Sequence, residues 1–215
     1  MDSITPADLT DSTNLLITEQ LLAEGWSLTR AFIDESDCRE LYLQAERFYQ
    51  QHQMVQAGIG RSQGFRIDRK IRSDHVIWLD PKHTSGAQER YFNKLESLKT
   101  CLNQSLFLGL FDLECHMAIY PVGAYYTKHL DCFQANSLRT LTCILYLNQD
   151  WHPAEGGQLR LYTQVDDDTH YVDIYPVAGQ FLTFLSARFR HEVLPTRRQR
   201  ASISGWFKRH SFEVV

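Results

Sequence analysis

The sequence predicts an all-β barrel or sandwich with two helices packed on one side. Two amphipathic stretches come first in the chain, and about eight short strand-like runs with turn signals between them follow from residue 113 onward. A length of 215 residues suits one sizeable domain. We therefore expect a flexible tail over residues 1–14 and a single domain over residues 15–215.

The N-terminal half supplies both predicted helices. A short strand is expected at 25–33, and the run "DESD" (34–37) offers N-cap residues for a helix that ends near Gln51. The apolar face of this helix is expected to carry Leu41, Leu43, Ala45, Phe48 and Tyr49. A polar segment rich in Arg and Gly follows a strand candidate at 54–60, and a further strand is expected at 75–80. Tyr91 and a series of leucines then recur at helical spacing over 85–107.

The predicted strands of the C-terminal half are 114–120, 124–131, 139–148, 157–162, 171–175, 179–185, 190–195 and 201–209. Residues two apart on a strand share a face, so each run presents one set of side chains to the barrel interior.

Composition excludes several functional classes. The net charge of −4 gives no global basic field of the kind that binds nucleic acid. The five cysteines are scattered and form no CxxC pair, which argues against a zinc knuckle or a disulfide framework and favours a reducing, cytoplasmic location. The acidic, polar N-terminus lacks the apolar core of a secretion signal, and no apolar run is long enough to cross a membrane.

Candidate metal ligands lie in "YYTKHLDCF" (125–133). His129 and Asp131 are two apart on a predicted strand and would point the same way. The pair alone is weak evidence, because it is expected by chance in a sequence this rich in His and Asp. His191 on a later strand is the third candidate. Two His and one carboxylate on one face of an ion are expected for non-haem Fe(II) oxygenases.

An arginine is predicted inside the barrel. Counting by two from Arg200 places Ser202, Ser204 and Trp206 on one face of the last strand. An unpaired buried guanidinium is costly, so its presence makes sense if an anionic ligand enters and pairs with it. Tyr146 could add a hydroxyl to the same carboxylate.

From residue 71 to residue 208 the sequence resembles the 2-oxoglutarate- and Fe(II)-dependent dioxygenases, in the prolyl 4-hydroxylase branch that includes the hypoxia-sensing enzymes and their compact bacterial relatives. The matching segments occur in the family's order: "IRSDHVIWLD", "YPVGAYYTKHLDCF", "RTLTCILYLNQDW", "EGGQLRLY", "RHEVLPTRRQR" and "ISGWF". The resemblance implies a double-stranded β-helix, a jelly-roll barrel.

Residue roles follow from this resemblance. His129, Asp131 and His191 are implied as iron ligands, and Arg200, Tyr146, Tyr120 and Trp206 as residues that bind 2-oxoglutarate or line the pocket beside the iron. The spacing from Tyr120 to His129 is one residue shorter than in the hypoxia-sensing enzymes. Arg139 resembles an arginine at the substrate mouth, and Arg72 and Asp74 resemble a pair in the segment that closes over the substrate.

The implied reaction is hydroxylation of a prolyl residue in a protein substrate, with succinate and CO2 as products. The implied cofactors are Fe(II), 2-oxoglutarate and O2, with ascorbate as a further candidate. An exposed proline loop of elongation factor Tu is the candidate substrate, and a monomer with no nucleic acid or membrane partner is expected. Two alternatives stay open: a hydroxylase of a free amino acid or small molecule, and a non-catalytic oxygen or 2-oxoglutarate sensor that binds a partner.

Overall fold

The computed structural model describes residues 6–58, 66–132 and 138–210, with side chains from residue 12 onward. Its helices are α1 (Pro6–Glu24), α2 (Glu35–Gln50) and α3 (Ala87–Leu106), with short 3-10 turns at Pro81–His83 and Pro153–Glu155. Its strands are β1 (Trp26–Thr29), β2 (Val55–Gln56), β3 (His75–Leu79), β4 (Leu110–Tyr120), β5 (Tyr126–His129), β6 (Arg139–Tyr146), β7 (Leu159–Gln164), β8 (Asp167–Ile174), β9 (Phe181–Leu185), β10 (His191–Val193) and β11 (Arg200–Arg209).

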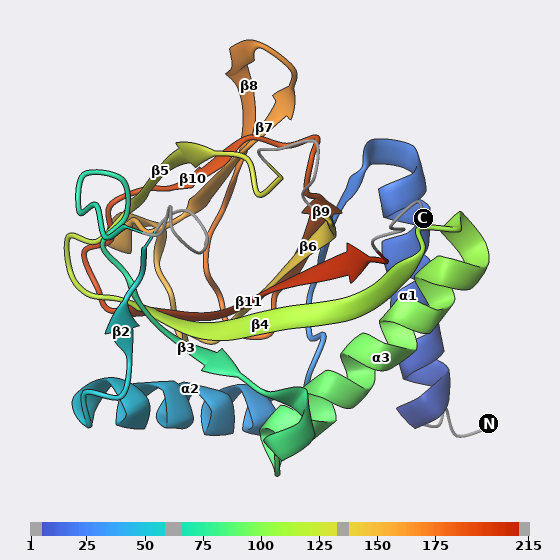
Figure 1. The fold of residues 1–215 in the computed structure, drawn as a ribbon, viewed down its shortest axis with the longest axis horizontal. Coiled ribbons are helices and arrows are strands. Elements are labelled where there is room, and N and C mark those ends of the chain that lie inside the picture. The colour runs from blue at the N-terminus through green and yellow to red at the C-terminus, as the bar shows by residue number, and fades with distance from the viewer. Residues whose placement is uncertain (1–5, 59–65, 133–137, 211–215) are drawn as a thin grey trace, which may run out of the picture.

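The strands form two antiparallel sheets that face each other as a jelly-roll barrel. The larger sheet has the order β1-β9-β6-β11-β4-β3-β2, and the smaller has the order β5-β10-β7-β8. All three helices lie against the outer face of the larger sheet, and the β7–β8 hairpin projects beyond the smaller one (Figure 1). The predicted mainly-β fold with helices on one side is therefore confirmed, and each of the eight strand runs after residue 113 contains a strand.

Strand alternation divides the side chains of the larger sheet between two cores. The odd-numbered residues of its central strands, such as Met117, Leu141 and Ile203, are buried against the helices. The even-numbered residues face the smaller sheet, where Tyr146 and Phe184 pack against Leu161. The interior of the barrel thus receives the even positions of β4, β6 and β11.

Helices α2 and α3 form where the sequence predicted them. Asp34 occupies the N-cap of α2 although its side chain makes no capping hydrogen bond, and Leu41 and Ala45 are fully buried. Leu43, which was expected on the apolar face, is 50% exposed. Helix α3 buries Tyr91 and the leucines at its helical spacing.

Helix α1 was not predicted. The chain is helical from Pro6, where a flexible tail to residue 14 was expected, so the expectation is wrong for residues 6–14. The buried side of α1 carries polar groups: Asn14 donates to Ser97, and Thr18 lies 3.5 Å from the Cys101 sulfur. These polar residues interrupt the apolar stripe that would have marked an amphipathic helix. The 15–215 domain boundary stays a prediction.

No helix within the described residues is both long enough and apolar enough to cross a membrane. The strand expected at 54–60 is observed as β2, while residues 59 and 60 lie outside the described part.

Candidate metal and cosubstrate site

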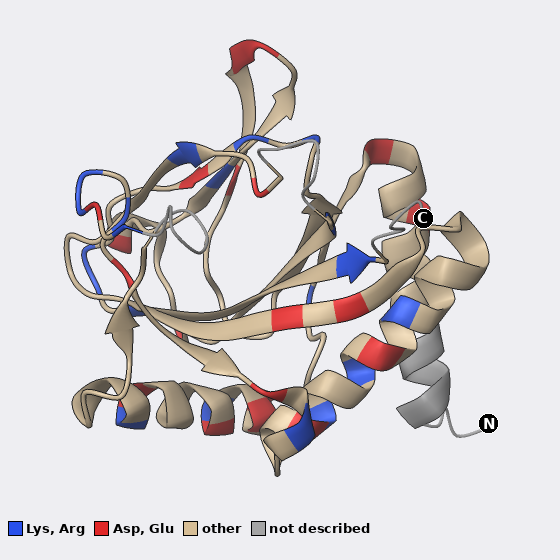
Figure 2. Cartoon of the chain, viewed as in Figure 1, with Lys and Arg blue, Asp and Glu red and all other residues tan. Residues whose placement is uncertain are grey.

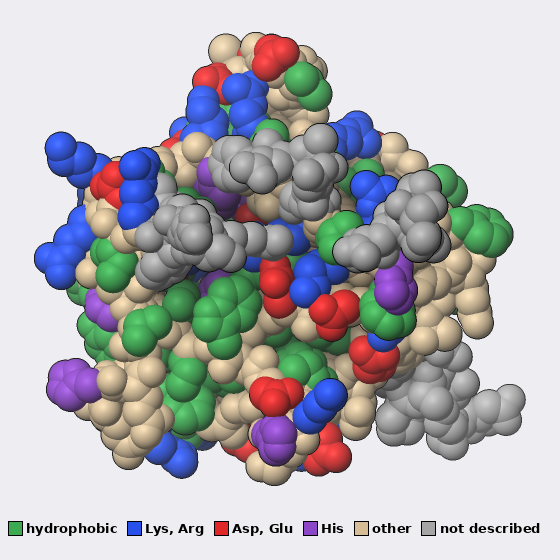
Figure 3. All heavy atoms as spheres, in the orientation of Figure 1, with side chains coloured by type: hydrophobic (Ala, Val, Ile, Leu, Met, Phe, Trp, Pro, Cys, Tyr) green, Lys and Arg blue, Asp and Glu red, His purple; other side chains and the backbone are tan. Residues whose placement is uncertain are grey.

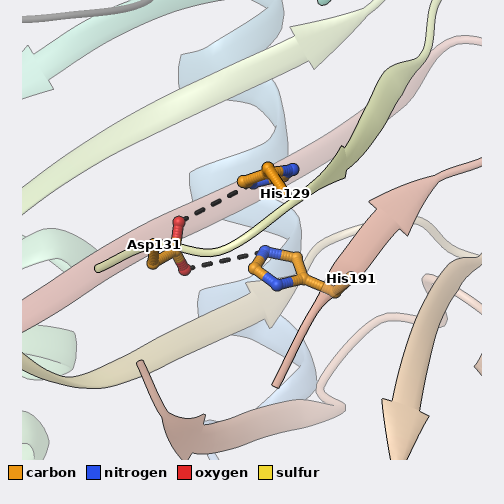
Figure 4. A group of neighbouring side chains, drawn as sticks. All are labelled: His129, Asp131 and His191. Carbon is orange, nitrogen blue, oxygen red and sulfur yellow. Dashed lines mark ion pairs between the residues drawn. The ribbon is translucent and has the colours of Figure 1, made fainter. Parts of the chain in front are cut away.

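The three predicted metal ligands come together at the edge of the smaller sheet. His129 ends β5, Asp131 follows in the next loop, and His191 begins β10 directly opposite His129 in the antiparallel register. One ligand atom from each residue lies within 4.8 Å of the others. The Nε2 atoms of His129 and His191 are 3.7 Å and 3.6 Å from the two carboxylate oxygens of Asp131 (Figure 4).

The ligand side chains are held by hydrogen bonds on the side away from the cluster. The Nδ1 atoms of His129 and His191 lie 2.7 Å and 3.2 Å from the backbone carbonyls of Thr127 and Phe189. These contacts fix the tautomer that donates from Nδ1, so the lone pair of each Nε2 is available to a metal ion. The Thr142 hydroxyl donates to Asp131 at 2.8 Å, which orients the carboxylate.

The electrostatics of the cluster suit metal binding. Burial, together with the facing His191, lowers the pKa of His129 to about 3, so the imidazole is neutral at physiological pH. Burial alone would raise the pKa of Asp131, but the neighbouring His191 and His129 outweigh it and lower the pKa. Neutral imidazole and ionised carboxylate are the forms that coordinate a metal ion. This donor set fits Fe(II).

Arg200 lies inside the barrel, as the sequence predicted, and is 1% exposed. Its Nη1 donates to Ser202 at 3.2 Å, while its Nε has no hydrogen-bond partner. Within the described residues no carboxylate forms an ion pair with it. An uncompensated guanidinium inside a barrel is costly, so this geometry fits an entering anion.

Two tyrosines accompany Arg200. Tyr120 is its partner in the β4–β11 register, and the guanidinium lies 4.7 Å from the centre of that ring. Tyr146 is the partner of Ser202 on β6, and its buried hydroxyl has no hydrogen-bond partner. Burial raises the pKa of Tyr146 to about 12, against the charge of Arg200, so the hydroxyl stays a donor. Arg200, Ser202 and Tyr146 thus leave donors available for a carboxylate.

Trp206 and Arg139 form one wall beside the ligand cluster. The Arg139 guanidinium stacks over the Trp206 ring at 3.7 Å, and its Nε donates to Glu114 at 2.5 Å. The Nε1 of Trp206 is buried without a hydrogen-bond partner. The structure therefore brings the two predicted residues into contact, with Trp206 on β11 and Arg139 at the start of the neighbouring strand β6.

Arg72 and Asp74 form the expected pair. The guanidinium binds the carboxylate through two hydrogen bonds of 2.8 Å and 2.5 Å, and the side chain of Asp74 is completely buried. Arg72 also lies 4.3 Å from the centre of the Tyr126 ring, which stacks on His129 at 3.6 Å between ring centres. The pair thus connects the segment before β3 to a predicted metal ligand through the Tyr126 ring.

Sequence reasoning missed Trp78, Tyr126 and Thr142 near the site. Trp78 on β3 packs edge-on against His116 of β4 and is 55% exposed. Strand parity could have found Trp78 and Thr142, because both share a face with interior positions of their sheet. Tyr126 lies three residues before His129, a spacing that gives no such signal on a strand.

Comparison with known proteins is consistent with this geometry. The family model described as the 2OG-Fe(II) oxygenase superfamily matches residues 115–208. The chain is 30% identical over 197 residues to the hypoxia-inducible factor prolyl hydroxylase of Caenorhabditis elegans, covering 85% of this chain and 26% of that protein. It is 30% identical to Egl nine homolog 1 of Homo sapiens over 157 residues, covering 68% of this chain and 35% of that protein. The chain therefore spans about a quarter to a third of these curated relatives.

Two solved structures are similar over nearly the whole chain. A prolyl-4-hydroxylase of Pseudomonas putida superposes with a TM-score of 0.83 at 36% identity, covering 92% of this chain and all of that one. A prolyl hydroxylase of Trichoplax adhaerens, solved with a peptide of the hypoxia-inducible factor oxygen degradation domain, has a TM-score of 0.84 at 25% identity, covering 97% of this chain and 94% of that one.

Proposed function

This chain belongs to the 2OG-Fe(II) oxygenase superfamily, in its prolyl 4-hydroxylase branch, and from that premise we propose that it hydroxylates a prolyl residue of a protein substrate. The observation that carries the proposal is the buried cluster of His129, Asp131 and His191 inside the same barrel as Arg200, which forms no ion pair with a carboxylate of the described residues. The family uses Fe(II), 2-oxoglutarate and O2. Elongation factor Tu is the substrate we propose to test first.

In this proposal His129, Asp131 and His191 hold the ferrous ion, and Arg200 with Tyr146 and Ser202 binds the far carboxylate of 2-oxoglutarate. The bound iron and cosubstrate together supply O2 activation and the oxidant that hydroxylates a C–H bond, with succinate and CO2 as products. Thr142 keeps the Asp131 carboxylate oriented through its 2.8 Å hydrogen bond. Tyr120, beside the Arg200 guanidinium, completes the polar wall on the cosubstrate side.

The surroundings of the site favour a polypeptide over a small, enclosed substrate. Trp78 is 55% exposed, and its ring lies 6.3 Å from that of the buried Trp206. An exposed indole that lies next to a buried indole of the site is suited to packing against another protein chain. Arg139 and the Arg72–Asp74 pair border the same region, and we propose that they position the substrate chain.

The first experiment is an anaerobic visible spectrum of the protein with Fe(II), before and after 2-oxoglutarate is added. We expect a new weak charge-transfer band, which reports chelation of the ferrous ion by the keto acid. The Asp131→Ala variant should lose the band, whereas the matched His116→Ala variant should keep it, because His116 lies outside the ligand cluster. Equal loss in both variants, or no band in the folded iron-bound protein, would contradict the assignment.

The substrate proposal is tested by mass spectrometry. Elongation factor Tu incubated with the enzyme, Fe(II), 2-oxoglutarate, ascorbate and air should gain the mass of one oxygen atom on a single proline. Omission of ascorbate tests the expected role of that reductant. If only free amino acids become hydroxylated, the first alternative is correct. If 2-oxoglutarate binds but no decarboxylation occurs, the protein is a sensor. The monomeric state and the cytoplasmic location stay proposals.

A further inference from the structure

A pocket lies beside the ligand cluster, and apart from Arg139 its lining residues have no role in the site described so far. Its volume is about 550 Å³. The turn between β7 and β8, residues 164–166, forms one side of it. Figure 2 shows Lys and Arg segments on the ribbons next to this hairpin. The described residues that line it are Leu130, Cys132, Arg139, Thr140, Gln164, Val165, Asp166, Leu185, Ala187, Arg188, Arg190 and Arg209.

The lining is strongly cationic. Four arginines contribute to it against one carboxylate, that of Asp166. Arg188 and Arg209 are exposed and form no ion pair with any residue in the described ranges. Figure 3 shows Lys and Arg side chains gathered at the base of the same hairpin. The pocket therefore has a net positive charge, although the whole chain is acidic.

The Arg190 guanidinium has a hydrogen-bond donor that no acceptor in the described residues satisfies. Its Nη2 atom is buried and has no hydrogen-bond partner. Arg190 forms two long ion pairs, at 3.5 Å with Asp168 and at 3.8 Å with Asp166, and its side chain is 30% exposed. Asp168 also binds Lys128. A buried donor left in this state gains free energy when an acceptor enters.

The pocket is directly continuous with the ligand cluster along the chain. Leu130 and Cys132 flank Asp131, and Arg190 immediately precedes His191. Arg139 belongs to both regions, because it lines the pocket and stacks on Trp206. Neighbouring Cα atoms are about 3.8 Å apart, so a substrate chain with its proline at the cluster can reach the pocket within a few residues.

We propose that this pocket, defined by Arg188, Arg190 and Arg209 with Arg139 at its inner edge, binds an acidic side chain of the polypeptide substrate a few residues from the hydroxylated proline. The inference rests on the proposed prolyl hydroxylation. Guanidinium groups bind carboxylates through paired, directional hydrogen bonds, and a ligand carboxylate would pair with Arg188 and Arg209, since Arg139 and Arg190 already form ion pairs with carboxylates of the chain. The apolar lining supplied by Leu130, Val165 and Leu185 suits the methylene groups of such a side chain.

The test compares fluorescein-labelled short peptides that share one central proline. One peptide carries two Glu after the proline, one carries two Glu before it, and their matched partners carry Gln at the same positions. Binding to the Fe(II)- and 2-oxoglutarate-loaded protein is followed by fluorescence anisotropy under nitrogen at low ionic strength. We expect one acidic peptide to bind about tenfold more tightly than its Gln partner, since hydrogen bonds to charged groups are the stronger class.

The variants locate the effect. Arg188→Gln combined with Arg190→Gln should remove the preference for Glu, and the separate Arg209→Gln variant should weaken it. Arg47→Gln is the matched control, because Arg47 is an exposed arginine on α2, on the far side of the larger sheet from the hairpin. If the double variant fails to fold, Arg190→Lys and Arg209→Gln decide the question, because the first keeps the charge and the second changes only an exposed side chain.

Several outcomes would overturn the proposal. These are no detectable binding of either acidic peptide, equal binding of the Glu and Gln peptides, or a preference that the pocket variants leave unchanged. A different result would indicate a site for a small free anion instead. In that case inorganic phosphate would abolish the preference for the Glu peptide, and the Glu and Gln peptides would be turned over equally. Failure of the proposed function is separate: an acidic peptide that binds through the arginines but is never hydroxylated contradicts prolyl hydroxylation alone.

Discussion

Arg200 gives the sharpest prediction, because its replacement should affect the free protein and the ligand complex in opposite directions. In the free protein the guanidinium is 1% exposed and has Ser202 as its hydrogen-bond acceptor, with no carboxylate paired to it in the described ranges. Arg200→Met removes the charge and keeps a long apolar stem. Replacing buried charges by packed apolar groups is neutral or stabilising by about 1–4 kcal/mol. We therefore expect the metal-free variant to be at least as stable as the wild type.

The complex should respond in the other direction. Without Arg200, the far carboxylate of 2-oxoglutarate would be buried with only the hydroxyls of Ser202 and Tyr146 as donors. Removing one partner of a buried charge pair costs about 3–5 kcal/mol, so the affinity should fall by at least about a hundredfold. A ligand at about one hundred times its Kd stabilises the wild type by about 2.7 kcal/mol, and at the same concentration the variant gains about 0.4 kcal/mol.

Urea unfolding measures both effects, first without metal and then with Fe(II) and 2-oxoglutarate under nitrogen. Arg197→Met is the matched control, because Arg197 is an exposed arginine in the loop that precedes β11 and its replacement should leave both values unchanged. The reasoning is refuted if Arg200→Met binds 2-oxoglutarate within a few-fold of the wild type. It is also refuted if the metal-free variant loses more than about 2 kcal/mol, a loss typical of breaking a stabilising buried contact.

Three further predictions concern stability. Asp74→Ala leaves the Arg72 guanidinium buried without its carboxylate, and denaturant unfolding should show a loss of about 3 kcal/mol or more; a loss below about 1 kcal/mol would contradict the assigned pair. In Gly205→Val, the new Cβ would lie 3.1 Å from the Cys143 sulfur, so we expect a loss of about 1–3 kcal/mol, measured as a lower Tm; an unchanged Tm would show that the sheet relaxes. Burial lowers the pKa of His116 to about 3, below its usual unfolded value of about 6.5, so the native state stays neutral while the unfolded state binds a proton below that pH. The metal-free wild type should therefore lose about 2 kcal/mol more than His116→Phe between pH 6.5 and pH 5, and equal acid losses in urea titrations would refute this.

The sequence by itself determined most of the secondary structure and which strand residues face the barrel interior. Strand alternation places Arg200 and Trp206 on one face of β11, and both are buried in the barrel interior. The same rule predicted that His129 and Asp131 would point together. Local periodicity suffices for Arg200 and Trp206 because both lie on β11, whereas Asp131 lies in the loop after β5.

Helix α1 could not be predicted from the sequence, because the polar groups on its buried face find their hydrogen-bond partners far away in the chain. Asn14 donates to Ser97, and Thr18 contacts Cys101, both more than eighty residues later. A polar residue on a packed face looks like a loop residue until its partner is known. Tertiary packing therefore decided the outcome for this helix.

Tertiary structure also decided which residues share a site. The pairing of His129 with His191 follows from the register of β5 and β10, which are about sixty residues apart in the chain. The contact of Tyr126 with Arg72 and the gathering of Arg188, Arg190 and Arg209 around one pocket likewise depend on strand order across the two sheets. Sequence periodicity specifies which way a side chain faces, but only the closed barrel determines what it faces, because long-range pairing sets those distances.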